Sequence, residues 1–121
     1  MASGIVVATD APVDARQLVR FAKRGIVGLE RTGSYLGHQS GDFCIAFSSC
    51  RANLRPVDRM TKRTVELLAD GQLSPFFEAI VEAMTEVLYD SLTMCPTTIG
   101  ARGRRAEGLD LACFADLLPL K

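Results

Sequence analysis

A short apolar run near the N-terminus, from Ile5 to Thr9, constrains the fold of this chain more than any other segment. Its residues are β-branched or small, and apolar residues do not alternate with polar ones along it. A run of this kind is typical of a strand that is covered on both faces of its sheet. We therefore expect a buried strand here, which ends at the turn-forming residues 10–12.

A helix is expected directly after this strand. Asp14 is a suitable N-cap, with Gln17 three residues later as its capping-box partner. Gly33 favours a stop, and apolar residues recur before it at helical spacing: Leu18, Ala22, Ile26 and Leu29. Gly25 and Gly28 would each destabilise a helix interior by about 1 kcal/mol relative to alanine. Their presence predicts close packing against a sheet or another helix.

Residues 43–48 predict a second strand with two unlike faces. With a period of two, one face is bulky (Phe43, Ile45 and Phe47) and the other is small (Asp42, Cys44, Ala46 and Ser48). We expect the bulky face to meet helices and the small face to meet a closely packed second layer.

The helix between the two strands predicts that they are parallel neighbours. Parallel strands begin at the same end of a sheet. Ser3, which precedes the first strand, would then lie near Ser40 and Asp42 at the head of the second.

The C-terminal half predicts a second long helix. Ser74 and Pro75 suit its N-cap and first helical position, an apolar stripe continues to Leu92, and Pro96 ends the pattern. Weaker predictions surround it: a connection over 49–63, a strand over 64–68 or alternatively a short helix over 57–68, a strand over 97–99, a basic turn over 100–105 and a short helix within 109–118. Nothing marks a linker or a repeat, so we expect a single unit over residues 1–121.

Composition excludes several classes of function. Fourteen Lys and Arg residues balance fourteen Asp and Glu, so the basic excess of a nucleic-acid-binding protein is missing. No apolar stretch approaches the roughly 20 residues of a membrane-spanning helix, and no signal-peptide pattern opens the chain. The four cysteines lack the CxxC spacing of a zinc site. We expect no metal or organic cofactor, no membrane contact, and reduced thiols in a cytoplasmic protein.

Three further features have two interpretations each. His38, the only histidine, is either a general base or a solvated loop residue, and we favour the second. Cys44 is either a reactive thiol or a buried structural one, and the second is favoured because nothing nearby would lower its pKa. Arg102, Arg104 and Arg105 predict a solvated turn, with a phosphate or subunit contact as the alternative.

Several segments together carry a family resemblance: IVVATDAP (5–12), GLERTG (28–33), SGD (40–42), IAFS (45–48), LSPFFEA (73–79) and YDSL (89–92). In this order and spacing they resemble the C-terminal (beta) subunit of the DmpA-type aminopeptidases. That family comprises L-aminopeptidase/D-esterase and beta-peptidyl aminopeptidase enzymes, and nylon-oligomer hydrolases are relatives. The resemblance extends from about Ser3 to about Leu109.

The resemblance implies a fold and a reaction. The fold is α/β, part of a four-layer alpha-beta-beta-alpha sandwich that an alpha portion absent from this chain completes. Autoproteolysis frees a serine as the first residue of the beta subunit, and this serine is the nucleophile. Ser3 is the matching position, and Ser40 and Asp42 match the serine and acidic residue that assist it. The expected substrates are small peptides, amides or esters that lose an N-terminal amino acid through an acyl-enzyme.

A free N-terminal amine suits this chemistry. A serine hydroxyl is a poor nucleophile until a base takes its proton. An α-amine with a pKa of about 7.7–8.0 is roughly 10–20% neutral at pH 7, so an N-terminal serine carries its own base. Met1 and Ala2 precede Ser3 here, and both must be removed before the nitrogen of Ser3 becomes basic.

The resemblance also implies partners. An alpha-subunit-like chain or a missing N-terminal portion would complete the fold, and alpha-beta units would assemble into a homo-oligomer. The alternative is a non-catalytic structural or interaction module, which has the same fold but lacks its alpha partner.

Overall fold

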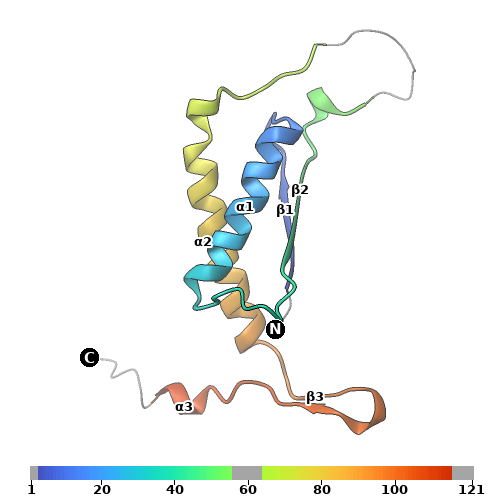
Figure 1. Cartoon of the computed structure of the whole chain (residues 1–121), viewed down its shortest axis with the longest axis vertical. Helices are drawn as coiled ribbons and strands as arrows, with labels where there is room; N and C mark the ends of the chain where they lie inside the picture. The colour runs from blue at the N-terminus through green and yellow to red at the C-terminus, as the bar shows by residue number, and fades with distance from the viewer. Residues whose placement is uncertain (1–2, 56–63, 116–121) are drawn as a thin grey trace. The chain divides into compact units, whose positions relative to one another are not determined.

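The computed structural model describes residues 3–55 and 64–115 (Figure 1). Contacts group the chain into two compact units, Met1–Thr85 and Glu86–Lys121. The first unit contains a two-stranded sheet, helix α1 (Ala15–Arg31) and most of helix α2 (Ser74–Thr93). The second contains the end of α2 and the segments that follow it.

The sheet of the first unit consists of β1 (Gly4–Thr9) and β2 (Phe43–Ser48). The strands are parallel, with Gly4 opposite Phe43 and Thr9 opposite Ser48. Helix α1 connects them and packs against the sheet (Figure 1). The predicted α/β class and the parallel pairing are thus confirmed.

Helix α1 begins and ends where the sequence predicts. The side chain of Asp14 accepts a hydrogen bond from the backbone N–H of Gln17 at 2.7 Å, and the Gln17 side chain accepts one from the Asp14 N–H at 3.2 Å. This completes a capping box. At the other end Gly33 has a φ of 98°, a left-handed conformation that favours glycine.

The two helical glycines mark close approaches, as predicted. A Cβ atom at Gly25 would lie 2.8 Å from the Cys44 sulfur and 3.2 Å from Ile5 Cγ2, so α1 lies directly on the sheet. A Cβ at Gly28 would lie 2.6 Å from the Cβ of Met84, so α2 lies directly on α1. The first unit therefore has three successive parts: sheet, α1 and the first turns of α2 (Figure 1).

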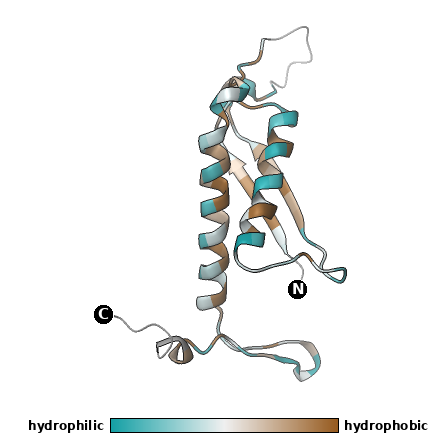
Figure 2. Cartoon of the chain, turned by 60° about the vertical axis from the view of Figure 1, so that its left-hand side comes forward, coloured by the Kyte–Doolittle hydropathy of each residue, from teal (hydrophilic) through white to brown (hydrophobic). Residues whose placement is uncertain are grey.

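The predicted assignment of the strand faces was wrong. The small face of β2, with Cys44 and Ala46, packs on helix α1 rather than on a second layer. The bulky face is exposed instead: Ile45 is 66% exposed, as is its neighbour Val6 on β1. The physical reason is the glycine contact, because only small side chains let α1 approach the sheet so closely. The prediction that the first strand is covered on both faces was also wrong, because Ile5 is buried while Val6 on the opposite face of β1 is 66% exposed. Both strands are nevertheless mainly apolar (Figure 2).

We call this exposed surface the apolar sheet face. It consists of alternate residues of the paired strands, all of them exposed: Gly4, Val6, Ala8, Phe43, Ile45 and Phe47. An uncovered apolar face beside a helix-covered one corresponds to half of the predicted sandwich.

The core of the first unit lies between α1, α2 and the turn after β1. Phe21 on α1 is fully buried, and its ring stacks on that of Phe76 with centroids 5.7 Å apart. Leu73, Ala11 and Val13 complete the buried cluster. The N-terminal turns of α2 therefore pack against α1 on the side of α1 that faces away from the sheet.

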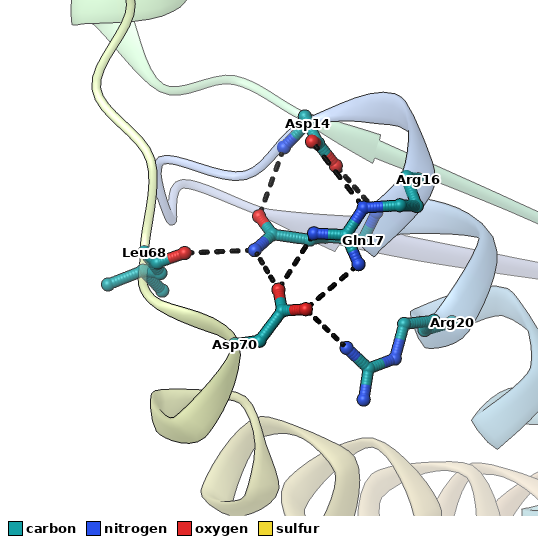
Figure 3. A network of polar contacts seen from close by, with 6 residues as sticks. All are labelled: Asp14, Arg16, Gln17, Arg20, Leu68 and Asp70. Atoms are coloured by element: carbon teal, nitrogen blue, oxygen red, sulfur yellow. Dashed lines mark hydrogen bonds and ion pairs between the residues drawn. The ribbon is translucent and has the colours of Figure 1, made fainter.

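A polar network joins α1 to the segment that leads into α2 (Figure 3). Both terminal nitrogens of Arg16 donate to the Asp70 carboxylate, at 2.9 and 2.8 Å. The Gln17 amide donates to Asp70 at 3.0 Å and to the Leu68 carbonyl at 2.9 Å. Arg20 lies 3.5 Å from the same carboxylate. Sequence analysis gave Gln17 a capping role only, because its second contact spans more than fifty residues.

The connection between β2 and α2 differs from prediction. Residues 64–69 form neither a strand nor a helix. The predicted strand over 64–68 is therefore wrong. The alternative prediction, a helix over 57–68, is wrong for residues 64–68, and its residues 57–63 lie outside the described residues. Two short 3₁₀ turns are present, Arg51–Asn53 and Asp70–Gln72. The backbone N–H of Leu68 donates to the Pro12 carbonyl, which fixes this segment without regular structure.

The second unit contains a small hairpin. Strands β3 (Thr98–Ile99) and β4 (Arg105–Ala106) pair antiparallel, with a tight turn over Ala101–Gly103 between them. A short helix, α3 (Ala112–Ala115), follows. The predicted strand, basic turn and C-terminal helix all appear, although residues 116–118 of that helix lie outside the described residues.

Within residues 3–55 and 64–115, no helix has both the length and the apolar character needed to cross a membrane. In the same residues no three His, Cys, Asp or Glu side chains are grouped so as to hold a metal ion.

Candidate active site

The N-terminal ends of β1 and β2 bring three polar residues together. The backbone N–H of Ser3 donates to Asp42 Oδ1 at 2.9 Å. The backbone N–H of Phe43 donates to the Ser3 carbonyl at 2.9 Å, which continues the sheet hydrogen bonding to the first described residue. Parallel pairing therefore places the nitrogen of Ser3 beside the carboxylate of Asp42.

Ser40 holds the other oxygen of the same carboxylate. Its hydroxyl donates to Asp42 Oδ2 at 2.7 Å. A turn positions it, because the backbone N–H of Ser40 donates to the Gly37 carbonyl at 2.8 Å. The carboxylate is thus held from both sides, one oxygen by Ser3 and the other by Ser40.

These hydrogen bonds lower the pKa of the Asp42 carboxyl below its ordinary value. The hydroxyl of Ser40 is the largest cause, partial burial opposes it, and the hydroxyl and N–H of Ser3 add to the lowering. All of these donors are neutral groups that stabilise the charged form. Asp42 is therefore an anion at neutral pH, and within the described residues it makes no ion pair.

The structure confirms the predicted proximity of Ser3, Ser40 and Asp42, while their catalytic roles stay a prediction. His38 lies in the same loop but is exposed, as favoured by sequence. Cys44 is half-buried under α1, and burial raises the pKa of its thiol. A raised pKa disfavours the reactive thiolate.

Sequence analysis missed the backbone that presents Ser40. Leu36 has a φ of 50°, a left-handed conformation that is uncommon for residues other than glycine. A Cβ at Gly37 would lie 2.7 Å from the Tyr35 ring, so the ring rests on the glycine. Gly37 was the available signal, because a side chain at this position would meet the Tyr35 ring.

The arrangement has a definite chemical meaning. In this chain the nitrogen of Ser3 is a peptide amide, which donates to Asp42 and has no useful basicity. With Ser3 as the first residue, the same nitrogen would be an α-amine beside a carboxylate. That carboxylate would orient the amine and stabilise the ammonium formed when the amine takes a proton.

Comparison with known proteins gives the family context. The profile of peptidase family S58 matches residues 3–106. The beta-peptidyl aminopeptidase BapA of Sphingosinicella microcystinivorans is 36% identical over 105 residues, which cover 87% of this chain and 26% of that protein. The chain thus spans about a quarter of the length of this curated relative.

Solved structures resemble the chain over nearly all its length. The PH0078 protein from Pyrococcus horikoshii OT3 matches with a TM-score of 0.83 and 37% identity, over 93% of this chain and 31% of that one. The L-aminopeptidase D-Ala-esterase/amidase from Ochrobactrum anthropi matches with a TM-score of 0.78 and 30% identity, over 93% of this chain and 32% of that one. The latter is described as a prototype for the serine aminopeptidases and a variant of the Ntn hydrolase fold.

Proposed function

Because this chain belongs to peptidase family S58, we propose that it is the nucleophile-bearing part of a serine N-terminal-nucleophile aminopeptidase or amidase. Its mixed helix and strand fold is part of the Ntn hydrolase fold. One observation carries the proposal: the Ser3 nitrogen lies 2.9 Å from the ionised carboxylate of Asp42, which Ser40 holds at 2.7 Å. Ser3 is the nucleophile, and Asp42 and Ser40 support its amine.

The proposed reaction has two stages. Ser3 Oγ attacks the carbonyl carbon of the scissile amide while its proton passes to the Ser3 amine. The C–N bond then breaks, the leaving amine takes that proton, and the acyl group remains as an ester on Ser3 Oγ. A water molecule, deprotonated by the same amine, cleaves the ester and restores the hydroxyl. No metal or organic cofactor enters these steps.

Formation of the amine requires cleavage between Ala2 and Ser3. In a self-processing enzyme the Ser3 hydroxyl attacks the carbonyl of the preceding residue, and hydrolysis of the resulting ester frees the N-terminus. Asp42 already accepts a hydrogen bond from the Ser3 N–H before this step. The site is therefore organised before the amine exists.

The proposed partner is an alpha portion that covers the apolar sheet face. Val6 and Ile45 are each 66% exposed on that face, and apolar patches beyond a few hundred Å² on soluble monomers generally mark interfaces. The chain spans about a quarter of a beta-peptidyl aminopeptidase, which leaves ample length for a second layer. We propose small peptides with an N-terminal α- or β-amino acid as substrates, and assembly of alpha-beta units into a homo-oligomer.

The test uses enzyme purified from its native host together with whatever copurifies. Intact-mass analysis should find Ser3 as the first residue, and a slowly hydrolysed aminoacyl ester should leave its acyl group on the Ser3 peptide. Ser3→Ala should reduce hydrolysis of aminoacyl anilides to background. Ser49→Ala is the matched control, since this exposed serine lies beyond the opposite end of β2.

Activity that persists with Met1 or Ala2 still attached would overturn the mechanism, because the nitrogen of Ser3 would then be an amide. If Met1 and Ala2 are retained and no acylation occurs, the non-catalytic module is the better account.

A further inference from the structure

The hairpin of β3 and β4 carries three arginines within four residues (Figure 1). Arg102, Arg104 and Arg105 are all exposed. Arg105 lies 3.6 Å from the Glu107 carboxylate, and neither of the others makes an ion pair with any described residue. With Thr98 and Gly100, the three arginines line an open groove of about 540 Å³. We call residues 98–106 the arginine hairpin.

The backbone of the arginine hairpin disfavours an arginine at its tip. Arg102 has φ 60° and ψ 28°, Gly103 has φ 72°, and the Arg104 N–H donates to the Ala101 carbonyl at 3.4 Å. This is a type I′ turn, whose first central position favours asparagine, aspartate or glycine. A long side chain in the left-handed region costs free energy. Turn chemistry therefore does not explain an arginine at position 102.

Helix α2 carries the opposite charge. Four acidic residues follow one another at intervals of four and so form one stripe along the helix: Glu78, Glu82, Glu86 and Asp90. All four are exposed, and the helix contains no lysine or arginine. None of them makes an ion pair with a described residue. Like charges at this spacing destabilise a helix. We call these four residues the acidic stripe.

We propose that the arginine hairpin of one copy of this chain binds the acidic stripe of α2 in a second copy. The planar guanidinium groups match carboxylates in geometry, since each can donate two hydrogen bonds to one carboxylate. The occupant follows from charge complementarity, since a cationic and an anionic surface are both present on the same chain. Self-association would bring the three arginines to the four carboxylates and offset much of both charges without a foreign partner. The contact involves none of the residues of the candidate active site.

The test measures self-association of the full chain by sedimentation at low and high salt. Arg102→Asn removes the charge but suits the turn, so it separates binding from folding. It should weaken association about two- to fivefold, and the triple change Arg102→Asn, Arg104→Gln, Arg105→Gln at least about tenfold. Association of the wild type should weaken as salt rises. The matched control is Arg51→Gln, an exposed arginine outside the arginine hairpin, which should change nothing.

Charge reversal identifies the partner surface. Chains with Arg102→Glu and Arg104→Glu, or with Glu82→Lys and Glu86→Lys, should each associate poorly alone. An equimolar mixture of the two should regain association, because the hairpin of either variant then meets a stripe of opposite charge on the other variant. A mixture that stays as weak as its components would overturn the proposal.

Other results would also overturn it. If the wild type sediments as a monomer at every concentration, a second copy does not bind the arginine hairpin. If that monomer binds a polyglutamate peptide, the partner of the arginine hairpin is a different acidic protein. Association that is insensitive to salt and to Arg102→Asn would instead belong to the apolar sheet face. None of these outcomes depends on whether the chain hydrolyses amides.

Discussion

Two aspartates near opposite ends of the β1–β2 sheet each have a carboxylate that is fixed by hydrogen bonds, but the donors of these bonds differ. Asp70 accepts two hydrogen bonds from the guanidinium of Arg16, at 2.9 and 2.8 Å. Asp42 accepts from the Ser40 hydroxyl and from the Ser3 N–H, at 2.7 and 2.9 Å. The pKa of both carboxyls is lowered, chiefly by Arg16 in one case and by Ser40 in the other. Both are therefore anions near neutral pH.

The difference lies in what offsets the charge. Two arginines neutralise Asp70 within the chain, and the result is a contact that fastens the segment before α2 to helix α1. Among the described residues, no cation pairs with Asp42. The Ser40 hydroxyl and the Ser3 N–H that donate to Asp42 are neutral groups, so its charge can still pair with an amine formed at Ser3. The comparison indicates a structural role for Asp70, and it supports the proposal that Asp42 assists the reaction.

Replacing each aspartate by asparagine should separate these roles and give the largest effect. In the processed enzyme, Asp42→Asn should lower kcat by roughly 10²–10³-fold, as expected for a lost preorganised charge. Asp70→Asn should leave kcat per folded molecule unchanged but lower the Tm, because two arginines lose their acceptor. Anilide hydrolysis and thermal unfolding measure the two effects. If Asp70→Asn lowered kcat as much as Asp42→Asn, the two aspartates would not have the different roles inferred for them.

Ser40→Ala should give a smaller loss of turnover, on the order of tenfold, since a neutral donor contributes less than the charge it orients. The variant has a second readout. The pKa of the Asp42 carboxyl should rise, because Ser40 is the main cause of its lowering. Carbon-13 NMR of the carboxyl follows this pKa. An unchanged pKa with reduced activity would mean that Ser40 acts without Asp42.

The sequence predicted the N-terminal part of this site well, because local signals and topology agree there. The capping box of Asp14 and Gln17 marks the start of α1. A helix that connects two strands predicts that the strands are parallel neighbours, as β1 and β2 are. Parallel pairing alone then brings Ser3 to Asp42. The catalytic roles rest on resemblance rather than on these patterns, so they stay predictions.

The sequence led to the wrong prediction of which face of β2 meets the helix. Alternation shows that Ile45 and Cys44 point to opposite faces, but not which face is covered. Gly25 decides this, since its contact with the Cys44 sulfur requires a small face under α1. The Asp70 network was missed for a related reason. Its partners are more than fifty residues apart, and no periodic pattern joins an arginine on a helix to a loop aspartate.

Acid should test the structural role of Asp70 through its effect on stability. The folded pKa of Asp70 lies below its unfolded value of about 3.9. Its contribution to the free energy of unfolding is therefore fully present above that value and is lost as the pH falls through the folded pKa. Wild type and Asp70→Asn should differ in free energy of unfolding at neutral pH and converge in acid. Equal differences at every pH would show that the asparagine acts through packing rather than charge.

His38→Ala should have the smallest effect and is the sharpest check on Asp42 as the supporting group. His38 is exposed, and its imidazole makes no hydrogen bond or ion pair with the described residues. The proposed base is the amine of Ser3, so removing the imidazole should leave kcat within a few-fold of wild type. A Ser–His mechanism predicts the opposite, because a histidine base contributes roughly 10²–10⁴-fold. The measurement is kcat against pH for both variants. Loss of turnover in His38→Ala together with full turnover in Asp42→Asn would transfer the role of base to His38.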